Sequence, residues 1–250
     1  MAPTIILITG ANRGVGKGLL ERYAARDNHI VIAANRDPEH PTSGALENVP
    51  TGQGSRIIIV KIDASVESDA SAAVQELVST HGIDHLDLVI ANAAISYVYP
   101  KVSDLRISDL QAHFKVNVFG VVWLYQATLP LLRKSANPRW ITVGSTGGSI
   151  KNQPPVPNAA YAPTKTAVHW LTKRMNEEED WLLAFVVHPG WVQTDMGNYS
   201  AGILGGAYGV EEAPVTIDDS CNGVVRLIDS ATKPSYGGKM WDYEGTQQAW

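Results

Sequence analysis

The sequence predicts an α/β fold, a single domain in which a parallel β-sheet is doubly wound, with helices on both of its faces. Two observations support this fold class. Near-continuous apolar runs of strand length, typical of strands that are buried on both faces, recur along the chain. Helical patterns lie between these runs from start to finish, with no internal repeat and no linker. We therefore expect one domain over residues 1–250.

Six apolar runs are expected to form the body of the sheet, and a shorter seventh run follows the last helical pattern. Their near-continuous apolar character is what burial on both faces of a sheet requires. The expected strands span residues 4–9, 29–35, 56–62, 86–92, 139–145, 182–188 and 237–243.

Helical spacing of apolar residues predicts the connections between the strands. In 66–78 the apolar positions recur on one helix face, and Ser65 is the expected N-cap. Segment 37–55, rich in Pro, Gly, Ser and Thr, is expected to be a loop. The Gly-rich segment 196–214 is also expected to be a loop and to act as a mobile lid. The other helices are expected over residues 108–134, 160–180 and 216–231.

Composition and charge exclude several classes of partner. A net charge of −5 without a basic run argues against nucleic acid and against anionic membranes. The acidic cluster at 177–180 is expected to be a solvated helix end. Cys221 is the only cysteine, so no internal disulfide can form, and no Cys and His residues have the spacing of a zinc site. We find no signal peptide or spanning stretch and expect a cytoplasmic protein without a metal.

The first expected strand runs directly into a glycine-rich turn, TGANRGVG, that opens an amphipathic helix. Glycine lets the backbone turn sharply and approach a pyrophosphate, whose charge lies at the helix N-terminus. Tight turns also use glycine for steric reasons alone, but at the first βα turn of a parallel sheet this pattern indicates a dinucleotide. The arrangement is of the Rossmann type, and the residues expected to hold the cofactor here are Gly10, Asn12, Arg13, Gly14, Val15 and Gly16.

The end of the second expected strand indicates which dinucleotide binds. NAD-binding folds favour an acidic residue there, which hydrogen-bonds the ribose 2′-hydroxyl, whereas this chain has Asn35 followed by Arg36. An arginine suits a 2′-phosphate through charge-assisted bonds, and Arg13 could close on the same phosphate. The alternative is that both arginines are solvated loop residues and that Asp37 pairs with Arg36. We expect NADP rather than NAD.

Polar residues follow three of the later strands or lie in a helix beside them. Asp63 can meet an adenine amino group or cap the following helix. Asn92 lies at the ligand side of such a sheet, where it can contact the cofactor, tie neighbouring strands together, or do both. Asn117, in an apolar helical stretch, is either a structural bridge or the holder of a water. Ser145 has no base nearby in the sequence, so a turn-forming serine is the alternative to a functional one.

Tyr161 and Lys165 stand four residues apart in AAYAPTK, so a helix places them on one face. A free phenol has a pKa of about 10, too high for efficient acid–base work at neutral pH. A nearby ammonium group favours phenolate, and we expect Lys165 to lower the pKa of Tyr161 in this way. Pro163 is tolerated if the helix begins close to residue 160. Such pairs are often fortuitous, but the dinucleotide turn in the same chain makes a catalytic role the better interpretation.

These motifs, taken in order along the chain, resemble those of the short-chain dehydrogenase/reductase family in its compact single-domain branch. TGANRGVG looks like the family's T-G-x-x-x-G-x-G, ANAA like its N-N-A-G with alanine at positions 91 and 94, and YAPTK like its Y-x-x-x-K. Ser145 stands where the family has its catalytic serine. HPGWVQT matches P-G-x-V-x-T, which implies that Pro189, Val192 and Thr194 anchor the nicotinamide. Within the family, the chain looks closest to fungal ketoreductases of the norsolorinic acid type, then to the C-factor, sniffer and carbonyl-reductase group.

The resemblance implies an NADPH-dependent oxidoreductase that reduces a ketone, of an aromatic or polyketide-like kind, to an alcohol. Tyr161 would donate the proton, and Ser145 would hydrogen-bond the same oxygen. Lys165 would lower the pKa of Tyr161 and bind ribose, while Asn117 would hold a water that links Lys165 to solvent. Loops at the strand ends would line the substrate pocket with Ser96, Tyr97, Tyr99, Gln153, Trp191, Met196 and Tyr199.

Two other functions stay open at this point. One is an NAD-linked alcohol dehydrogenase that works mainly in the oxidative direction, against which Asn35 and Arg36 argue. The other is a catalytically idle NADP-binding sensor or scaffold, against which the intact Ser145, Tyr161 and Lys165 argue. Relatives commonly pair their long helices across a two-fold axis, so the resemblance also implies a homodimer or homotetramer.

Overall fold

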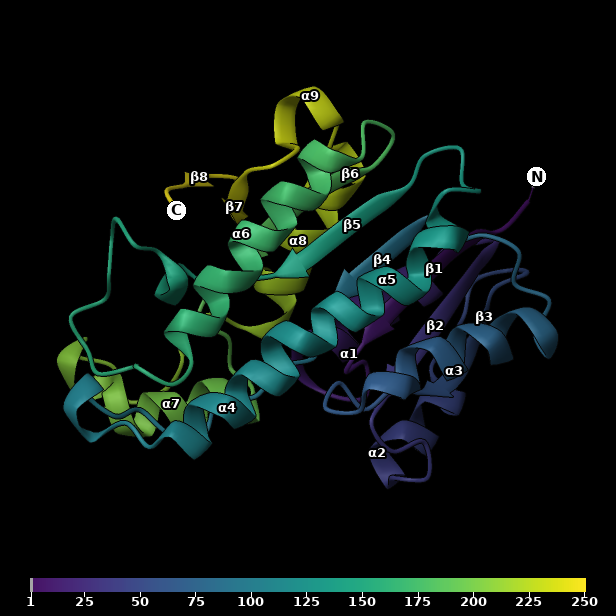
Figure 1. Cartoon of the computed structure of the whole chain (residues 1–250). Helices are drawn as coiled ribbons and strands as arrows, with labels where there is room; N and C mark the ends of the chain where they lie inside the picture. The colour runs from purple at the N-terminus through teal and green to yellow at the C-terminus, as the bar shows by residue number, and fades with distance from the viewer. Residues whose placement is uncertain (1) are drawn as a thin grey trace.

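A single mostly parallel sheet forms the centre of the molecule in the computed structural model, which describes residues 2–250 (Figure 1). The strand order is β3-β2-β1-β4-β5-β6-β7-β8, and β8 is antiparallel to β7. The seven expected strands are confirmed, while β8, made of two glutamines, carries no apolar signal. The strands are β1 Thr4–Thr9, β2 His29–Asn35, β3 Arg56–Lys61, β4 Leu88–Ala91, β5 Arg139–Val143, β6 Leu183–His188, β7 Met240–Asp242 and β8 Gln247–Gln248.

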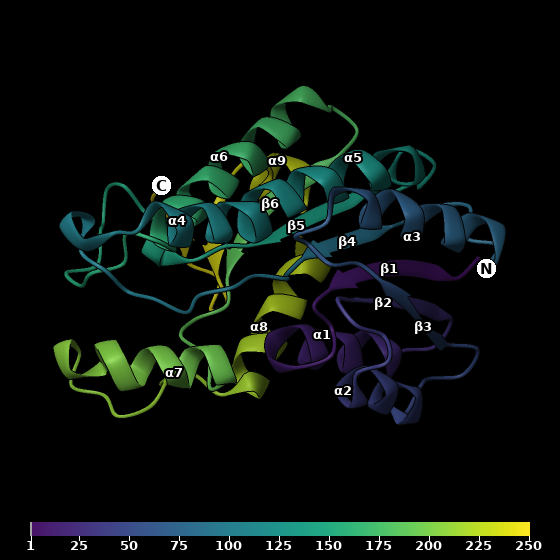
Figure 2. The same ribbon diagram turned by 60° about the horizontal axis from the view of Figure 1, so that its bottom comes forward.

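Helices cover both faces of the sheet, as the alternating pattern predicts. They are α1 Gly14–Ala24, α2 Pro41–Gly44, α3 Glu67–Ser79, α4 Ile107–Phe114, α5 Gly120–Leu132, α6 Ala162–Glu178, α7 Asp195–Leu204, α8 Ile217–Ser230 and α9 Lys233–Tyr236. Helices α3, α5 and α6 pack on one face, where Leu77, Leu124 and Val168 join the core (Figure 2). Helices α1 and α8 pack on the other face through Leu20 and Val224.

Two segments that were expected to be loops contain helices. Segment 37–55 holds α2 and a short 3₁₀-helix, Ala45–Asn48. Segment 196–214 holds most of α7, whose N-cap is Thr194, with its hydroxyl oxygen accepting the N–H of Gly197 at 3.1 Å. Glycine and proline content predicted loops here because composition alone does not show the caps that close the first turn of a short helix.

The helix expected over 108–134 is interrupted. A π-helical turn, Lys115–Phe119, joins α4 to α5, and such turns are often found at functional sites. The N-cap expected for α3 is also wrong, because Val66 occupies that position and no side chain caps the helix. The hydroxyl of Ser65 donates instead to Asp63 at 2.7 Å.

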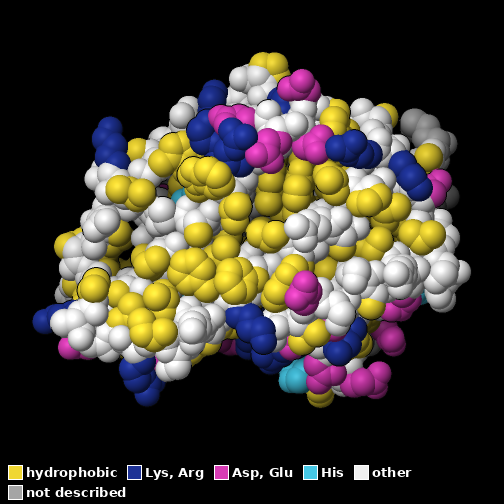
Figure 3. All heavy atoms as spheres, in the orientation of Figure 1, with side chains coloured by type: hydrophobic (Ala, Val, Ile, Leu, Met, Phe, Trp, Pro, Cys, Tyr) yellow, Lys and Arg dark blue, Asp and Glu magenta, His cyan; other side chains and the backbone are white. Residues whose placement is uncertain are grey.

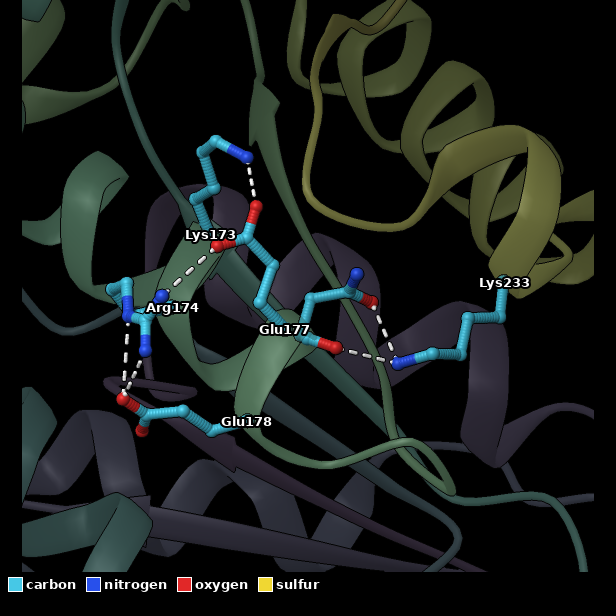
Figure 4. A network of polar contacts seen from close by, with 6 residues as sticks. Lys173, Arg174, Glu177, Glu178 and Lys233 are labelled. Atoms are coloured by element: carbon cyan, nitrogen blue, oxygen red, sulfur yellow. Dashed lines mark hydrogen bonds and ion pairs between the residues drawn. The ribbon is translucent and has the colours of Figure 1, made fainter.

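Three members of the acidic cluster at the end of α6, Glu177, Glu178 and Asp180, are solvated as expected, whereas the side chain of Glu179 is only 17% exposed and pairs with Arg133 (Figure 4). Lys173 pairs with Glu177 one turn further on, and Arg174 pairs with Glu178 at 2.9 Å. Exposed pairs of this spacing contribute only about 0.3–0.5 kcal/mol each. Lys233, from α9, donates to main-chain oxygens at and after the end of α6, the shortest at 2.6 Å, and so joins these two helices.

Three observations bear on the classes that composition excluded. None of the helices in residues 2–250 is long and apolar enough to cross a membrane. Over the same residues, no three His, Cys, Asp or Glu side chains gather as metal ligands would. Cys221 is buried, and a Cβ on Gly18 would lie 2.7 Å from its sulfur, so this thiol fills the contact between α8 and α1.

Candidate active site

The carboxyl ends of the parallel strands meet at one edge of the sheet, and the chain changes direction there. Strands β2 and β3 follow β1 on one side of it, and the chain then crosses to form β4 on the other side of β1. The edge between β1 and β4 is therefore the switch point of the sheet. Ligands of open α/β sheets bind in the crevice outside such a switch point. The glycine turn after β1 and the loop after β4 both begin at this place.

The turn between β1 and α1 depends on its three glycines. Gly10 and Gly14 have φ values of +63° and +54°, in the left-handed region that favours glycine. A Cβ on Gly16 would lie 2.2 Å from the main-chain oxygen of Gly10, so no larger residue fits there. The missing side chains leave a backbone cradle at the N-terminus of α1, and such a cradle suits a pyrophosphate. The residues present therefore fit a dinucleotide.

Asn92 ties the two halves of the switch point together. Its Nδ2 donates to the main-chain oxygens of Thr9, at 2.9 Å, and Gly10, at 3.2 Å. The Thr9 hydroxyl accepts the N–H groups of Asn92 and Ala93, both at 3.0 Å. The structural alternative for Asn92 is thus confirmed, and a contact of its side chain with the cofactor stays a prediction.

Asn35 holds the glycine turn against β2. The side chain is fully buried, and its Oδ1 accepts the N–H of Ala11 at 2.9 Å. Its Nδ2 has no hydrogen-bond partner among the described residues, and a buried donor without a partner is costly. Asn12, inside the turn, donates from Nδ2 to the hydroxyl of Thr42 at 2.7 Å and so links the turn to α2.

The two arginines expected at the 2′-phosphate differ in their surroundings. Arg36 is exposed and forms no ion pair within residues 2–250, and the alternative pair with Asp37 does not form. Asp37 instead accepts the N–H of Glu39 at 3.0 Å. Arg13 pairs with Asp195, the first residue of α7, at 3.1 Å between two exposed side chains. Such a pair contributes little stability, but it bridges the glycine turn and α7.

Asp63 shapes the turn before α3. Its Oδ1 accepts the N–H of Ser65 at 2.8 Å and the hydroxyl of the same residue at 2.7 Å. The alternative that Asp63 caps the following helix is wrong, because Val66 is the N-cap of α3 and no side chain caps that helix. The contact of Asp63 with an adenine stays a prediction.

Asn117 lies on the π-helical turn and is 1% exposed. Its Oδ1 accepts the N–H of Ile95 at 2.8 Å, and its Nδ2 donates to the oxygen of Ile95 at 2.9 Å and to the Thr164 hydroxyl at 3.1 Å. Both N–H groups of the amide are thereby used. The side chain is a structural bridge between the loop after β4 and the first turn of α6, and its expected role toward a water stays a prediction.

Tyr161, Lys165 and Ser145 come together at the carboxyl edge. Tyr161 is the N-cap residue of α6, which places Pro163 in the first turn, where it is tolerated. The Lys165 Nζ lies 5.5 Å from the centre of the Tyr161 ring and donates to the main-chain oxygen of Val143, the last residue of β5, at 2.8 Å. The Ser145 hydroxyl lies near enough to the Tyr161 phenol to lower its pKa.

The residues expected to anchor a nicotinamide lie beside the glycine turn. Thr194 donates from its N–H to the Val192 oxygen at 2.7 Å and caps α7 with its hydroxyl. A Cβ on Gly14 would lie 3.1 Å from Cγ2 of Thr194, so the two segments are in contact. The oxygen of Pro189 accepts the Ser220 hydroxyl at 2.6 Å, which fixes the start of this segment to α8.

Comparison with known proteins decides the family. The model of the short chain dehydrogenase family matches residues 4–201. The chain belongs to this family. The resemblance inferred from the motifs is confirmed, and the protein is an oxidoreductase built to use a nicotinamide cofactor.

Three relatives illustrate the similarity. This short-chain dehydrogenase is 39% identical to a norsolorinic acid ketoreductase of Dothistroma septosporum, over 99% of this chain and 92% of that protein. It is 37% identical to the norsolorinic acid ketoreductase of Aspergillus parasiticus, over 99% of this chain and 91% of that one. Among solved structures, the NADPH-bound carbonyl reductase from chicken fatty liver superposes with a TM-score of 0.86, at 26% identity and over 100% of both chains.

The aromatic residues expected to line the substrate pocket lie in the loop after β4 and in or just before α7, and Tyr99 is near enough to Tyr161 to raise the pKa of its phenol. Tyr199, on α7, donates its hydroxyl to the Tyr97 oxygen at 3.2 Å, and its ring lies 6.3 Å from that of Tyr99. Trp191 donates from Nε1 to the Ser200 hydroxyl at 2.8 Å. The contacts of Tyr199 hold α7 against the loop after β4, whereas the bond from Trp191 joins α7 to the segment that follows β6. Gln153 is exposed and forms no hydrogen bond or ring contact with the described part of the chain, so it is not part of this group.

Burial dominates the electrostatics of the Tyr161 and Lys165 pair. It raises the pKa of Tyr161 above its ordinary value, while the Ser145 hydroxyl lowers it and the Tyr99 phenol raises it. Burial also lowers the pKa of Lys165, to about 8. The expectation that Lys165 brings the pKa of Tyr161 below its ordinary value is therefore wrong for this structure, because withdrawal of the phenol from water has the largest effect and the Lys165 ammonium is not among the causes of the shift. The phenol keeps its proton at neutral pH, which is the form that a proton donor needs.

One residue of the site was missed. His169 lies one turn after Lys165 on α6, is buried, and accepts the N–H of Ser145 on its Nε2 at 3.2 Å. The i, i+4 spacing that singled out Tyr161 and Lys165 continues to His169, and this was the available signal.

Proposed function

We propose that this short-chain dehydrogenase reduces a ketone or related carbonyl compound to an alcohol, with NADPH as the hydride donor and Tyr161 as the proton donor. One observation carries the proposal: a protonated phenol, a serine hydroxyl and a buried ammonium group meet beside a glycine cradle at the switch point of the sheet. The nicotinamide, when bound, supplies the hydride to the carbonyl carbon.

The side chains then handle the charge that develops on the carbonyl oxygen. Tyr161 donates its proton to this oxygen, and the Ser145 hydroxyl donates a hydrogen bond to it. The donated proton leaves Tyr161 as a phenolate, and the Lys165 ammonium, 5.5 Å from the ring centre, stabilises that negative charge. With a pKa of about 8, Lys165 is still mostly protonated at neutral pH. The hydride and the proton together convert the carbonyl group to a secondary alcohol.

The preference for NADPH rests on charge at the end of β2. The chain has no carboxylate at position 35 to bind a ribose 2′-hydroxyl, and Arg36 next to it is exposed and forms no ion pair in the described structure. Arg13 can also bind the 2′-phosphate if its ion pair with Asp195 breaks. Breaking this pair costs little because both side chains are exposed. The NADPH-bound relative supports the same cofactor, whereas no observation favours an NAD-linked alcohol dehydrogenase or an idle scaffold.

Replacing Arg36 by Ala is expected to raise the KM for NADPH by roughly 10–100-fold, since one charge-assisted contact of about 1.5–3 kcal/mol is lost. The KM for NADH should change by less than about twofold, because NADH has no 2′-phosphate. Steady-state rates with each cofactor measure both values. Arg226→Ala, which alters an exposed arginine of α8 that forms no ion pair within residues 2–250, is the matched control. Equal effects of Arg36→Ala on both cofactors would contradict the assignment.

The substrate is proposed to be an aromatic or polyketide-like ketone. The ketoreductase relatives support this class, and so do the aromatic side chains gathered near Tyr161. The test is consumption of NADPH, followed by its absorbance, against a panel of aryl ketones, diketones and quinones. We expect turnover with flat aromatic members of the panel. Absence of turnover with every carbonyl compound would contradict the proposed function.

We also propose that the protein is a homodimer or homotetramer. The surface over α4, α5 and α6 carries a broad apolar area (Figure 3). The exposed apolar side chains of these elements and of the turn between α4 and α5 include Ile107, Phe119 and Trp170, which are 63%, 48% and 63% exposed. Apolar patches of this kind are typical of interaction sites. Light scattering at micromolar concentration is expected to give a mass of two or four chains, and Trp170→Glu should shift it toward one chain.

A further inference from the structure

His169 places an imidazole directly behind the proposed catalytic serine. It projects from α6 toward the end of β5, is 2% exposed, and has its Nε2 3.2 Å from the main-chain nitrogen of Ser145. The bond joins residues that are 24 positions apart in the sequence. None of the roles described above uses this side chain.

The main chain at Gly144, just before Ser145, lies in close contact with the His169 ring. A Cβ on Gly144 would lie 2.5 Å from Nε2 of His169 and 2.3 Å from a methyl group of Val186, so only glycine fits there. On His169 itself, the ring of Trp250 packs with its centre 5.8 Å away. The imidazole is thus enclosed by neighbours, and its position fixes the path of the backbone from β5 into the serine turn.

The hydrogen bond defines the protonation state of the ring. A nitrogen that accepts an N–H carries no proton, so the neutral ring has its proton on Nδ1, and a charged ring could not accept the bond. Burial, with smaller contributions from the nearby Lys165 ammonium and from His188, lowers the pKa of His169 to about 3. The proton-bearing Nδ1 has no partner among the described residues. A buried N–H without a partner costs free energy. The hydrogen bond that Nε2 accepts from Ser145 must therefore stabilise this tautomer by more than the unpaired Nδ1–H costs.

A second imidazole supports the next residue of the turn. Nε2 of His188, the last residue of β6, lies 3.3 Å from the hydroxyl of Thr146. Burial lowers the pKa of His188 to about 4, so this ring is also neutral. Two uncharged rings from two different elements therefore contact consecutive residues of the segment that carries Ser145.

We propose that His169 is a positioning residue, whose neutral imidazole holds the main chain of Ser145 so that the serine hydroxyl stays beside the Tyr161 phenol. This inference rests on the proposed function, because it requires Ser145 to act on the carbonyl oxygen. Small displacements of a group that acts in the transition state lower the rate steeply, whereas they leave distant binding contacts unchanged.

The test compares two replacements of similar size. His169→Gln keeps a hydrogen-bond acceptor at the distance of Nε2, and His169→Met removes it. We expect His169→Met to lower kcat for ketone reduction by roughly 10–100-fold, with the KM for NADPH within about twofold of the wild-type value, and His169→Gln to recover most of the loss. Thr172→Val, which alters another buried polar residue of α6, is the control, expected to reduce stability but to leave kcat within about twofold.

A direct spectroscopic readout accompanies the kinetics. In the wild-type protein, the ¹⁵N resonances of His169 at neutral pH should show the neutral tautomer with its proton on Nδ1. An Nε2-protonated or charged ring would overturn the inference, even if His169→Met did not fold. So would a His169→Met variant that keeps its kcat, or a His169→Gln variant as slow as His169→Met. If the wild-type protein consumed no NADPH with any carbonyl compound, the proposed function would fail instead, while the tautomer would still report on the contact.

Discussion

Replacing Tyr161 by Phe is expected to lower kcat for ketone reduction by roughly 10²–10⁴-fold, the usual contribution of a positioned general acid. The ring would keep its place at the start of α6, but no proton could pass to the carbonyl oxygen. The dissociation constant of NADPH should stay within about threefold, because the glycine cradle and Arg36 are untouched. Turnover measured with a reactive aryl ketone, and NADPH binding measured by fluorescence quenching, separate the two effects.

Tyr125→Phe is the matched control for this variant. Tyr125 lies on α5, and burial raises its pKa to about 12, yet it packs against Trp140 in the core, away from the carboxyl edge. Both variants remove one phenolic hydroxyl from a setting that disfavours ionisation. If Tyr161→Phe turned over as fast as Tyr125→Phe, the proton donor would have to be another group.

Replacing Lys165 by Met is expected to change activity and stability in opposite directions. Catalysis should fall by roughly 10²-fold or more, because the phenolate formed at Tyr161 loses the ammonium that stabilises it. The free energy of unfolding at pH 6–7 should rise by about 2 kcal/mol. Burial of the charged Lys165 destabilises the wild-type fold by about 3 kcal/mol, from its pKa of about 8 against the ordinary 10.5, and Met removes this cost. The variant also loses the hydrogen bond to Val143, which lowers its stability by about 1 kcal/mol.

The sign of the pH dependence follows from the lowered pKa of Lys165. Below about pH 8 the folded and unfolded chains both hold the proton, so the wild-type protein bears the full cost of the buried charge. Between about pH 8 and 10.5 the unfolded chain still binds the proton that the folded chain has released, and stability rises with pH. Urea unfolding of wild type and Lys165→Met at pH 6.5 and 9.5 should therefore show a stability difference that shrinks at the higher pH. A Lys165→Met variant less stable than wild type at pH 6.5 would contradict this account.

The parts of the site that are encoded locally could be predicted from the sequence. The glycine turn, the spacing of Tyr161 and Lys165 and the segment from Pro189 to Thr194 each lie within a few residues, and the structure brings them to one edge of the sheet. The strands were equally accessible, because burial on both faces leaves a near-continuous apolar run. Helix α7 was missed because its glycines hide a helix that depends on the cap from Thr194.

What could not be predicted depends on packing between distant segments. The pKa of Tyr161 is raised by burial and by Tyr99, against the opposing effect of Ser145, and both residues lie far away in the sequence. Similarly, the contact of His169 with Ser145 requires α6 to lie across the end of β5. Local spacing can place a lysine beside a phenol, but it does not show how much water the fold removes from both.

The most direct test of the central claim follows the hydride into the product. The wild-type protein is incubated with an aryl ketone and NADPH that carries deuterium at the transferred position of the nicotinamide C4, in ordinary water. Our account predicts an alcohol with one deuterium on the carbinol carbon and an ordinary hydroxyl proton, one molecule for each NADPH consumed. An alcohol without deuterium at that carbon, or NADPH consumed without formation of an alcohol, would contradict it.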